Sequence, residues 1–315
     1  MDPPRMIYRI ARAYYEDGKT QREIADRFGI SRIKVSRLLA RALQEKIVQI
    51  TIRAPEDHYT GLENQLELKY GLKETVIVEG KPAPEALLGS LGNAAAGYLH
   101  SILQGNEVVG LTWGRTLLSM VNGLHNMSLP ELQVVQMLGG LGEPEAEFHG
   151  ADLTRRMAQL FSSKPRLIHA PGIVRSPVLA GELMNDLQVK HTLELASRAD
   201  IALVGIGLFG PGSTIFRSNE ILSEADKELL ISLGAVGDIS FRFFNEKGEF
   251  ISSQIDERII GLSAIQLRNI PKIIGIAGGA DKYRTIRAAL RGRLIHVLIT
   301  DHLTAERLVN EKIKQ

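Results

Sequence analysis

The sequence contains no cysteine among its 315 residues. This excludes disulfide bonds, thiolate metal sites and a cysteine nucleophile. The eight histidines are scattered and show no His-x-x-x-His pair, so we expect neither a metal site nor a cofactor. No uninterrupted apolar run approaches the roughly 18 residues that a membrane helix needs, and the basic N-terminus lacks a signal-peptide core. We therefore expect no membrane partner and a cytoplasmic location.

The composition that remains is ordinary, with 44% apolar and 23% charged residues, and the length favours two domains of unequal size. The charge, however, is unevenly distributed. Residues 1–55 hold twelve Lys/Arg and six Asp/Glu, a net of +6, whereas the remainder holds 26 basic and 30 acidic residues, a net of −4. A basic head of this kind suits the neutralisation of DNA phosphates, although a basic surface can equally be a solvated face.

Residues 20–39 predict two short helices joined by a tight turn, the unit that places one helix in the DNA major groove. Thr20 followed by Glu23 forms a capping box that starts the first helix. Gly29 permits the left-handed backbone that ends it, and Ser31 caps the second helix. A small helical hairpin without a DNA-binding role is the alternative interpretation.

The second of these helices has an inward and an outward face. Its apolar residues repeat at i, i+3, i+4 and i+7 and face inward, namely Val35, Leu38, Leu39 and Ala42. At about 100° per residue, Ile33, Ser36 and Arg37 must point outward. The candidate DNA-binding residues are Gln21, Ser31, Arg32, Ile33, Lys34, Ser36, Arg37 and Arg41.

We expect three kinds of contact from this outward face. Arg32 and Arg37 would contact guanine or phosphate, and Ser36 a base edge or phosphate. Ile33 would contact a thymine methyl group. The flanking residues Lys34 and Arg41 would mainly bind backbone phosphates.

Further elements are predicted on either side of the motif. A helix is expected over residues 5–16, and an apolar alternation over residues 48–52 predicts a short strand that would form a wing. The head ends at Pro55. A helix over residues 59–70 follows, in which an apolar residue recurs at every fourth position. This narrow stripe fits equally a dimer seam and a first helix packed on the body.

From Glu74 onward, short apolar runs alternate with helical patterns. The runs cover residues 75–78, 107–112, 132–138, 166–170, 201–205, 273–278 and 294–299. The helical patterns between them include residues 85–103, 115–124, 151–161 and 283–291. Strands separated by helices imply a parallel sheet with helices on both faces. In such sheets, ligands bind beyond the C-terminal ends of the strands, where the strand order switches.

Two segments that follow predicted strands are rich in small residues. In the first, a strand runs through Gly114 into a helix, so backbone amides and the Thr116 hydroxyl form a phosphate cradle to which Arg115 adds charge. An ordinary strand–helix turn is the alternative. In the second, Gly139 and Gly140 let a ligand approach the backbone closely, or simply make a turn.

Two further segments offer charged groups. Asp238, after a glycine-containing stretch, can accept hydrogen bonds from sugar hydroxyls, although a turn residue is the plainer interpretation. Lys282, near the start of a helix, suits a phosphate, and its alternative is a surface lysine. None of the four segments is a GxGxxG or Walker sequence, which disfavours nucleotides. Their shared chemistry is that of an anion carrying hydroxyls, and an aromatic content of 5% argues against a large planar ring.

These segments, in this order behind this head, resemble the SorC family of sugar-responsive bacterial transcription regulators. The resemblance covers essentially the whole chain and rests on residues 14–39, 112–116, 234–238 and 277–282. It implies a C-terminal effector domain related to phosphosugar isomerases and deaminases but working as a sensor, in dimers or tetramers.

The resemblance also implies site residues. The phosphate of the effector would sit on the turn Gly114–Thr116 and near Gly139 and Gly140. Asp238 and Lys282 would contact the effector. His169 would line the pocket, within a His-Ala-Pro segment where some members carry Pro-Ala-Pro.

The prediction is therefore an α/β chain with a winged helix-turn-helix DNA-binding domain over residues 1–55. A Rossmann-like, mostly parallel-sheet domain over residues 56–315 would bind the effector and form the homo-oligomer. The chain would act as a transcriptional regulator of a carbohydrate-metabolism operon, and a phosphorylated sugar or polyol would control its binding to double-stranded operator DNA. No catalytic residue is assigned.

The alternative function is a phosphosugar isomerase or deaminase with an accessory DNA-binding head. Such chemistry needs an acid or base beside the reacting carbon. Candidates exist in Asp238, Glu143, His149 and His169, but no catalytic pairing at interpretable spacing is visible.

Overall fold

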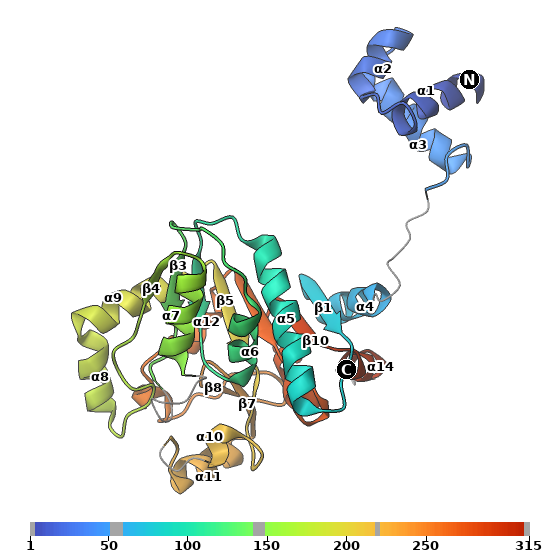
Figure 1. Ribbon diagram of the computed structural model, residues 1–315. Coiled ribbons are helices and arrows are strands. Elements are labelled where there is room, and N and C mark those ends of the chain that lie inside the picture. The colour runs from blue at the N-terminus through green and yellow to red at the C-terminus, as the bar shows by residue number, and fades with distance from the viewer. Residues whose placement is uncertain (1–3, 51–58, 141–148, 218–220, 312–315) are drawn as a thin grey trace. The chain divides into compact units, whose positions relative to one another are not determined.

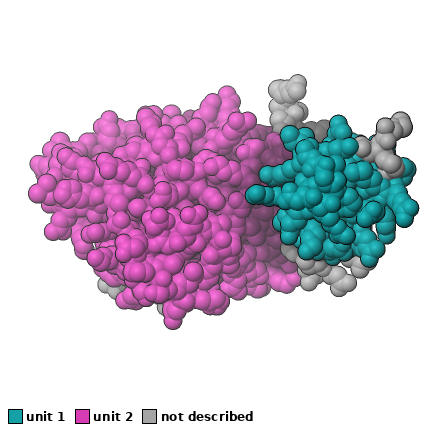
Figure 2. Space-filling model, turned by 90° about the horizontal axis from the view of Figure 1, so that it is seen from above, with its two compact units in different colours: residues 1–58 teal, residues 59–315 magenta. Residues whose placement is uncertain are grey.

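The computed structural model describes residues 4–50, 59–140, 149–217 and 221–311. The chain divides into two compact units, Met1–His58 and Tyr59–Gln315 (Figure 2). The boundary expected after Pro55 lies outside the described residues. Each unit is described by itself.

The first unit contains α1 (Pro4–Tyr15), α2 (Gln21–Phe28) and α3 (Arg32–Gln44). The expected capping box is confirmed, because Thr20 Oγ1 accepts from Glu23 N at 3.3 Å and the Glu23 carboxylate accepts from Thr20 N at 2.8 Å. Gly29 is left-handed and ends α2. The core of the unit consists of Ile7, Ile10, Ala11, Ala13, Ile24, Ala25, Val35, Leu38, Leu39 and Ala42.

The expected wing strand is not formed over residues 48–50, and the rest of that stretch lies outside the described residues. After α3 the backbone turns at Lys46, with φ of 58°, and Val48 N donates to Ala42 O at 3.1 Å. Ile47 and Val48 therefore pack against the helical core. A strand needs a neighbour for its backbone groups, and the described residues of this unit provide none.

The second unit is built on a parallel seven-stranded sheet in the order β1-β10-β9-β5-β2-β3-β4 (Figure 1). Its strands are β1 (Glu74–Val78), β2 (Val108–Leu111), β3 (Gln133–Gln136), β4 (Lys164–Arg166), β5 (Ile201–Gly205), β9 (Lys272–Ile276) and β10 (Val297–Asp301). The expected Rossmann-like sheet is thus confirmed. The chain runs from β2 to β3 and β4 on one side and resumes with β5 on the other, so the strand order reverses between β2 and β5.

Helices cover both faces of this sheet, and each face has its own apolar core. One face packs against α5 (Pro84–Ile102), α6 (Arg115–Gly123) and α7 (Gly150–Leu160). The other packs against α4 (Thr60–Tyr70), α9 (Leu187–Ala196), α12 (Ala264–Arg268), α13 (Tyr283–Arg291) and α14 (His302–Asn310), with α8 (Pro177–Asn185) beside α9. Among the described residues, no helix is long and apolar enough to cross a membrane.

The apolar stripe of α4 packs on the body. Leu66 and Tyr70 are buried in the core of the second unit, and the Tyr70 hydroxyl donates to Leu308 O at 3.2 Å. Of the two interpretations left open by the sequence, the structure therefore shows the helix packed on the body.

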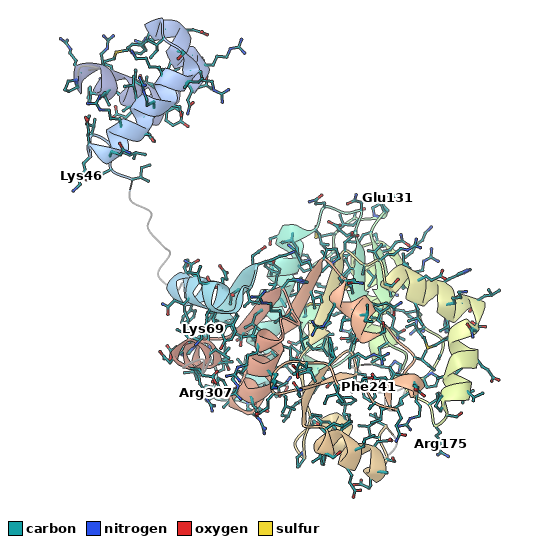
Figure 3. The ribbon with its side chains drawn as sticks, turned by 180° about the vertical axis from the view of Figure 1, so that it is seen from behind. Lys46, Lys69, Glu131, Arg175, Phe241 and Arg307 are labelled. Carbon is teal, nitrogen blue, oxygen red and sulfur yellow. The ribbon has the colours of Figure 1, made fainter. Side chains whose placement is uncertain are left out.

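A small antiparallel sheet lies beside the main one and was not predicted. It comprises β6 (Gly207–Leu208), β7 (Ala235–Ile239) and β8 (Arg242–Asn245), accompanied by α10 (Thr214–Arg217) and α11 (Glu224–Ser232). Asp238, expected in a segment that follows a strand, lies inside β7. Phe209, Phe241 and Phe243 form the aromatic centre of this lobe. Figure 3 marks the position of Phe241.

Candidate nucleic-acid interface and ligand cavity

The outward face of α3 is exposed as expected. Ile33 is 83% exposed, which is unusual for a large apolar side chain. Ser36 and Arg37 are also exposed. Together with Gln21, at the start of α2, these residues border a hollow of about 510 Å³, whose lining residues are Gln21, Arg32, Ile33, Ser36, Arg37 and Ala40. An apolar contact flanked by guanidinium and hydroxyl groups matches the chemistry of base edges in a major groove.

The other three expected DNA-binding residues, Ser31, Lys34 and Arg41, are not among those that line this hollow. The Ser31 hydroxyl accepts from Lys34 N at 3.2 Å, which makes it the cap of α3. The Lys34 side chain is half-buried. Arg41 Nε donates to Glu45 Oε1 at 2.6 Å, so part of the Arg41 charge is neutralised within the helix.

A cavity of about 750 Å³ opens in the second unit at the C-terminal ends of β2, β5, β9 and β10. This is where the strand order reverses, the position at which open parallel sheets bind ligands. The cavity brings together five residues predicted from the sequence, namely Gly114, Arg115, Thr116, Asp238 and Lys282.

One wall of the cavity is the beginning of α6. Gly114 has φ of 120°, which an L residue rarely adopts, and this conformation turns β2 directly into the helix. No described side chain caps α6, so the N–H groups of its first turn remain available to an anion. Thr116 is buried in this turn and also lines the cavity. At the rim, Arg115 forms an exposed ion pair with Glu85 at 3.0 Å.

A second wall is the turn after β9, which Asp301 holds in place. Asp301 Oδ2 accepts from Gly279 N and from Thr304 Oγ1, both at 2.7 Å. A Cβ atom on Gly278 would lie 2.5 Å from the same carboxylate oxygen, so only glycine fits there. Asp301 thereby fixes the segment that leads to Lys282. The sequence analysis missed it, although an Asp three residues before Thr304 at a helix start is a capping signal.

Asp238 and Lys282 both line the cavity, and each lies close enough to influence the charge of the other. Burial raises the pKa of the Asp238 carboxyl to about 6, although a hydrogen bond from Phe241 N at 3.1 Å and the charge of Lys282 oppose this shift. Asp238 Oδ1 has no hydrogen-bond partner among the described residues. Burial also lowers the pKa of the Lys282 ammonium, against the nearby charges of Asp281 and Asp238.

Ser240 is another cavity residue that the sequence analysis missed. It lines the cavity, is 5% exposed, and its hydroxyl has no partner among the described residues. Ser240 and Phe241 form the two-residue turn between β7 and β8, with φ of 54° and 62°. Positive φ at both central positions is the geometry that a two-residue hairpin between antiparallel strands favours, although it is costly for residues other than glycine, asparagine and aspartate.

The structure does not place Gly139, Gly140 and His169 at this cavity. A Cβ atom on Gly139 would lie 2.5 Å from Pro171 O, and Gly140 N donates to Ala170 O at 2.9 Å. These glycines therefore allow close approach of another chain segment, which is the turn alternative to ligand binding. His169 is exposed outside the cavity. Glu143, considered for the enzyme alternative, lies outside the described residues.

Comparison with protein families gives two matches. The family model described as "Putative sugar-binding domain" matches residues 55–310, which is most of the chain. The model for sigma-70 region 4 matches residues 9–45, the part that contains α2 and α3.

Similar proteins match over nearly the whole chain. The deoxyribonucleoside regulator of Bacillus subtilis is 33% identical over 303 residues, which cover 96% of each chain. The transcriptional regulator LsrR of Escherichia coli K12 is 34% identical over 303 residues, 95% of this chain and 92% of the relative. Among solved structures, the full-length sorbitol operon regulator SorC of Klebsiella pneumoniae has a TM-score of 0.75 at 31% identity, covering 98% of this chain and 100% of that one.

Proposed function

Because the chain belongs to the SorC family of sugar-responsive operon regulators, we propose that α3 binds operator DNA and that the cavity binds a phosphorylated sugar or polyol. The observation that carries the proposal is the cavity itself. It combines an uncapped helix N-terminus, a lysine and a buried carboxyl with one unpaired oxygen at the strand-order reversal of the sheet. The same chain carries the exposed basic face of α3.

The phosphate group belongs at the start of α6 under this proposal. Backbone N–H groups and the helix dipole favour an anion there, and the Thr116 hydroxyl and the Lys282 ammonium supply further donors. Asp238 would accept hydrogen bonds from sugar hydroxyls. A buried carboxylate oxygen without a partner, such as Asp238 Oδ1, is costly, so hydroxyl donors from the effector would offset that cost.

The effector would control DNA binding by preferring one arrangement of the second unit. A ligand shifts such an equilibrium by its differential affinity for the two states, which typically amounts to about 1–3 kcal/mol. We also propose that the chain acts as a homo-oligomer, because helix-turn-helix proteins of this kind commonly read two half-sites with two copies.

A thermal-shift screen tests the proposal. Five- and six-carbon sugar phosphates are compared with the same sugars lacking phosphate. A sugar phosphate at about 100 times its Kd is expected to stabilise the protein by about 2.7 kcal/mol. Equal stabilisation by the free sugar would overturn the phosphate assignment. Conversion of the sugar phosphate by the purified protein would instead support the enzyme alternative. Lys282→Met is the matched variant, and we expect it to lose most of the stabilisation.

A further inference from the structure

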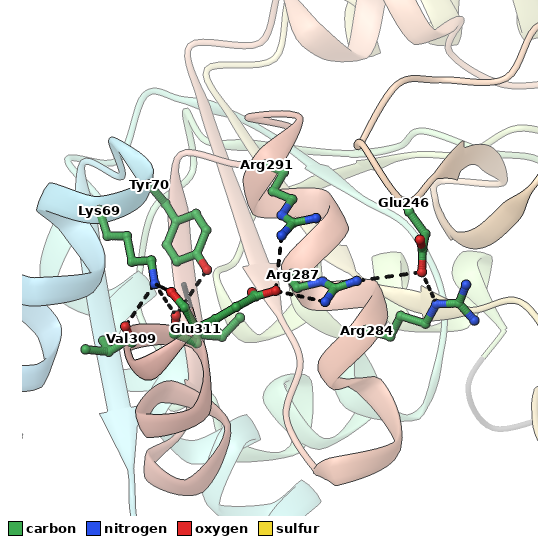
Figure 4. Close-up of polar contacts among 9 residues, drawn as sticks. Lys69, Tyr70, Glu246, Arg284, Arg287, Arg291, Val309 and Glu311 are labelled. Atoms are coloured by element: carbon green, nitrogen blue, oxygen red, sulfur yellow. Dashed lines mark hydrogen bonds and ion pairs between the residues drawn. The ribbon is translucent and has the colours of Figure 1, made fainter. Parts of the chain in front are cut away.

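Helix α4 contacts α14 at both of its ends. At the N-terminal end, the Tyr59 ring stacks on His302 with 5.2 Å between centroids and 6° between planes. At the C-terminal end, Lys69 Nζ donates to the carbonyl oxygens of Leu308 and Val309, both at 2.9 Å, and to that of Glu311 (Figure 4). The two helices therefore run side by side in the same direction.

Lys69 donates hydrogen bonds to carbonyl groups at the end of α14 that have no donor within the helix. The last carbonyls of a helix have no intrahelical donor, and α14 ends at Asn310. A cation placed at a helix C-terminus also interacts favourably with the helix dipole. Lys69 is half-buried there. The ammonium group thus serves as the C-terminal cap of a helix that lies far away in the sequence.

Helix α4 is also fixed to the sheet edge. Glu67 Oε1 accepts from Thr75 N at 2.8 Å, and Glu63 Oε1 accepts from Ile77 N at 3.0 Å. Both donors belong to β1, which is an edge strand. These bonds and the contacts to α14 hold α4, β1 and α14 together, and we call the three elements the α4–α14 unit.

The same unit reaches the ligand cavity. Asp301, Leu303, Thr304 and Arg307, from the cap and the body of α14, line the cavity. His302 Nδ1 accepts from Gly80 N at 2.7 Å, and Gly80 belongs to the segment that follows β1 and also lines the cavity. One side of α14 therefore faces the ligand space, while its ends hold α4.

A second helix from the cavity meets α14 at its C-terminal end. Helix α13 starts immediately after Lys282, and its Arg287 and Arg291 bind Glu311 Oε1 at 2.9 and 3.1 Å (Figure 4). The Glu311 carbonyl is one of the groups bound by Lys69. The Lys69 contact thus joins α4 to α14 and, through Glu311, to α13, two of the helices that carry cavity residues.

We propose that this α4–α14 unit transmits effector binding from the cavity to the DNA-binding part of the chain. The proposal rests on the proposed function, because it takes a sugar phosphate as the occupant of the cavity. The order of the elements along the chain supports it. Helix α4 is the first helix of the second unit, and only residues 51–58 separate its N-cap Tyr59 from the described part of the first unit. Lys69 is a positioning residue in this scheme and does not line the cavity.

The test compares three full-length variants with the wild type. Lys69→Met removes the three donors but keeps an unbranched side chain, and Lys69→Arg keeps donors and serves as rescue. Lys73→Met is the matched control, because Lys73 Nζ also binds a carbonyl, that of Pro271 at 2.9 Å, and this carbonyl does not belong to α14. Hydrogen exchange is measured with and without the panel sugar phosphate that gives the largest thermal shift, D-fructose 6-phosphate and D-ribose 5-phosphate included. Operator affinity is measured in parallel on a duplex selected in vitro.

We expect the sugar phosphate to slow exchange at residues 112–118 and to change exchange at residues 60–70 in the wild type. In Lys69→Met the first effect should remain, with Kd for the sugar phosphate within about twofold. The change at residues 60–70 should disappear, and the effector-induced change in operator affinity should fall by at least about threefold. Lys69→Arg and Lys73→Met should behave as the wild type.

Three results would overturn the inference, and they can be told apart. Protection at residues 112–118 with no change at residues 60–70 in the wild type would refute the transmission route alone. Normal coupling in a folded Lys69→Met variant would refute it as well. Absence of protection at residues 112–118 with every sugar phosphate would refute the proposed function, and the inference with it.

Discussion

Burial of the Asp238 carboxyl in the folded chain increases its affinity for a proton. Burial raises its pKa from 3.8 to about 6. Below pH 4 the carboxyl is protonated in both the folded and the unfolded chain, so it does not affect the free energy of unfolding. Between pH 4 and 6 the unfolded chain loses this proton first, which lowers the free energy of unfolding. Above pH 6 the full penalty remains, on the order of 3 kcal/mol.

Asp238→Asn is therefore expected to raise the melting temperature at pH 7.5, because the amide carries no charge and its oxygen still accepts from Phe241 N. The gain should disappear at pH 4. Thermal unfolding followed by circular dichroism at both pH values measures it. Asp17→Asn, at an exposed position of the first unit, is the control and should show no such pH dependence. A lower melting temperature of Asp238→Asn at pH 7.5 would contradict the argument.

Arg37 should determine operator recognition. The exposed guanidinium borders the hollow beside Ile33, and a bidentate contact to guanine discriminates by about 1–3 kcal/mol. Arg37→Ala is expected to weaken specific operator binding by about 10- to 100-fold in fluorescence anisotropy while leaving sugar phosphate binding unchanged. Arg12→Ala, which removes the same charge from an exposed ion pair on α1, is the control. Equal losses of operator affinity in Arg37→Ala and Arg12→Ala would show that Arg37 makes no specific contact with the operator.

At the scale of elements, the turn between β2 and α6 depends on backbone conformation. A Cβ atom on Gly114 would meet nothing within 4 Å, so the cost of Gly114→Ala comes from its φ of 120°. We expect a loss of about 1–3 kcal/mol in thermal or denaturant unfolding, together with weaker sugar phosphate binding because the start of α6 is displaced.

Gly97→Ala provides the matched control for Gly114→Ala. Gly97 lies inside α5, also with nothing within 4 Å of a Cβ atom, but its φ is outside the positive range. Alanine is the better helix former, so this variant should gain about 0.5–1 kcal/mol. The free energy of unfolding should therefore fall for Gly114→Ala and rise for Gly97→Ala. A neutral Gly114→Ala would show that the turn adopts another conformation.

The elements that the sequence predicted are those with a local signal. Thr20, Gly29 and Ser31 mark helix ends through caps that involve only nearby residues, and the structure forms each of them. The strand β7 carries no such signal, because Gly237 and Asp238 in its middle are typical of a turn. It is a strand because β6 and β8 pair with it and because only a hydrogen atom fits beside Thr285 at position 237. The expected wing strand is not formed over residues 48–50 for the same reason, because the described residues of the first unit offer no neighbouring strand.

At the scale of the whole molecule, only part of the cavity could be predicted from the sequence. Gly114 and Thr116 were found because a strand that turns into a helix is recognisable locally, as was Lys282 at a helix start. Asp301 and Ser240 were missed because their roles depend on which strands are neighbours. Asp301 reaches Gly279 only because β10 lies beside β9, and Ser240 reaches the cavity only through the small sheet. Strand order is a property of the assembled sheet, and no single segment encodes it.

The two parts of the chain carry net charges of opposite sign. We therefore expect the affinity for operator DNA and the affinity for the sugar phosphate to depend differently on salt concentration. Residues 1–55 carry a net of +6 and the rest a net of −4. DNA binding releases counterions, so contacts to about six phosphates would weaken operator binding by about 10³-fold between 50 and 200 mM KCl. A sugar phosphate held against the start of α6 and the buried side of Lys282 is screened less, because partly buried charges are less exposed to salt. Its affinity should therefore fall far less over the same range.

Anisotropy for the operator and calorimetry for the sugar phosphate, each at four KCl concentrations, measure the two slopes. Arg32→Ala should reduce the operator slope by about one if Arg32 binds phosphate. Ile33→Ala, at the neighbouring position of the same helix, carries no charge and should leave the slope unchanged while it lowers the preference for the operator over an unrelated duplex. A salt-independent operator affinity would mean that the basic head does not bind DNA phosphates, because every cation on that face would then have contributed nothing.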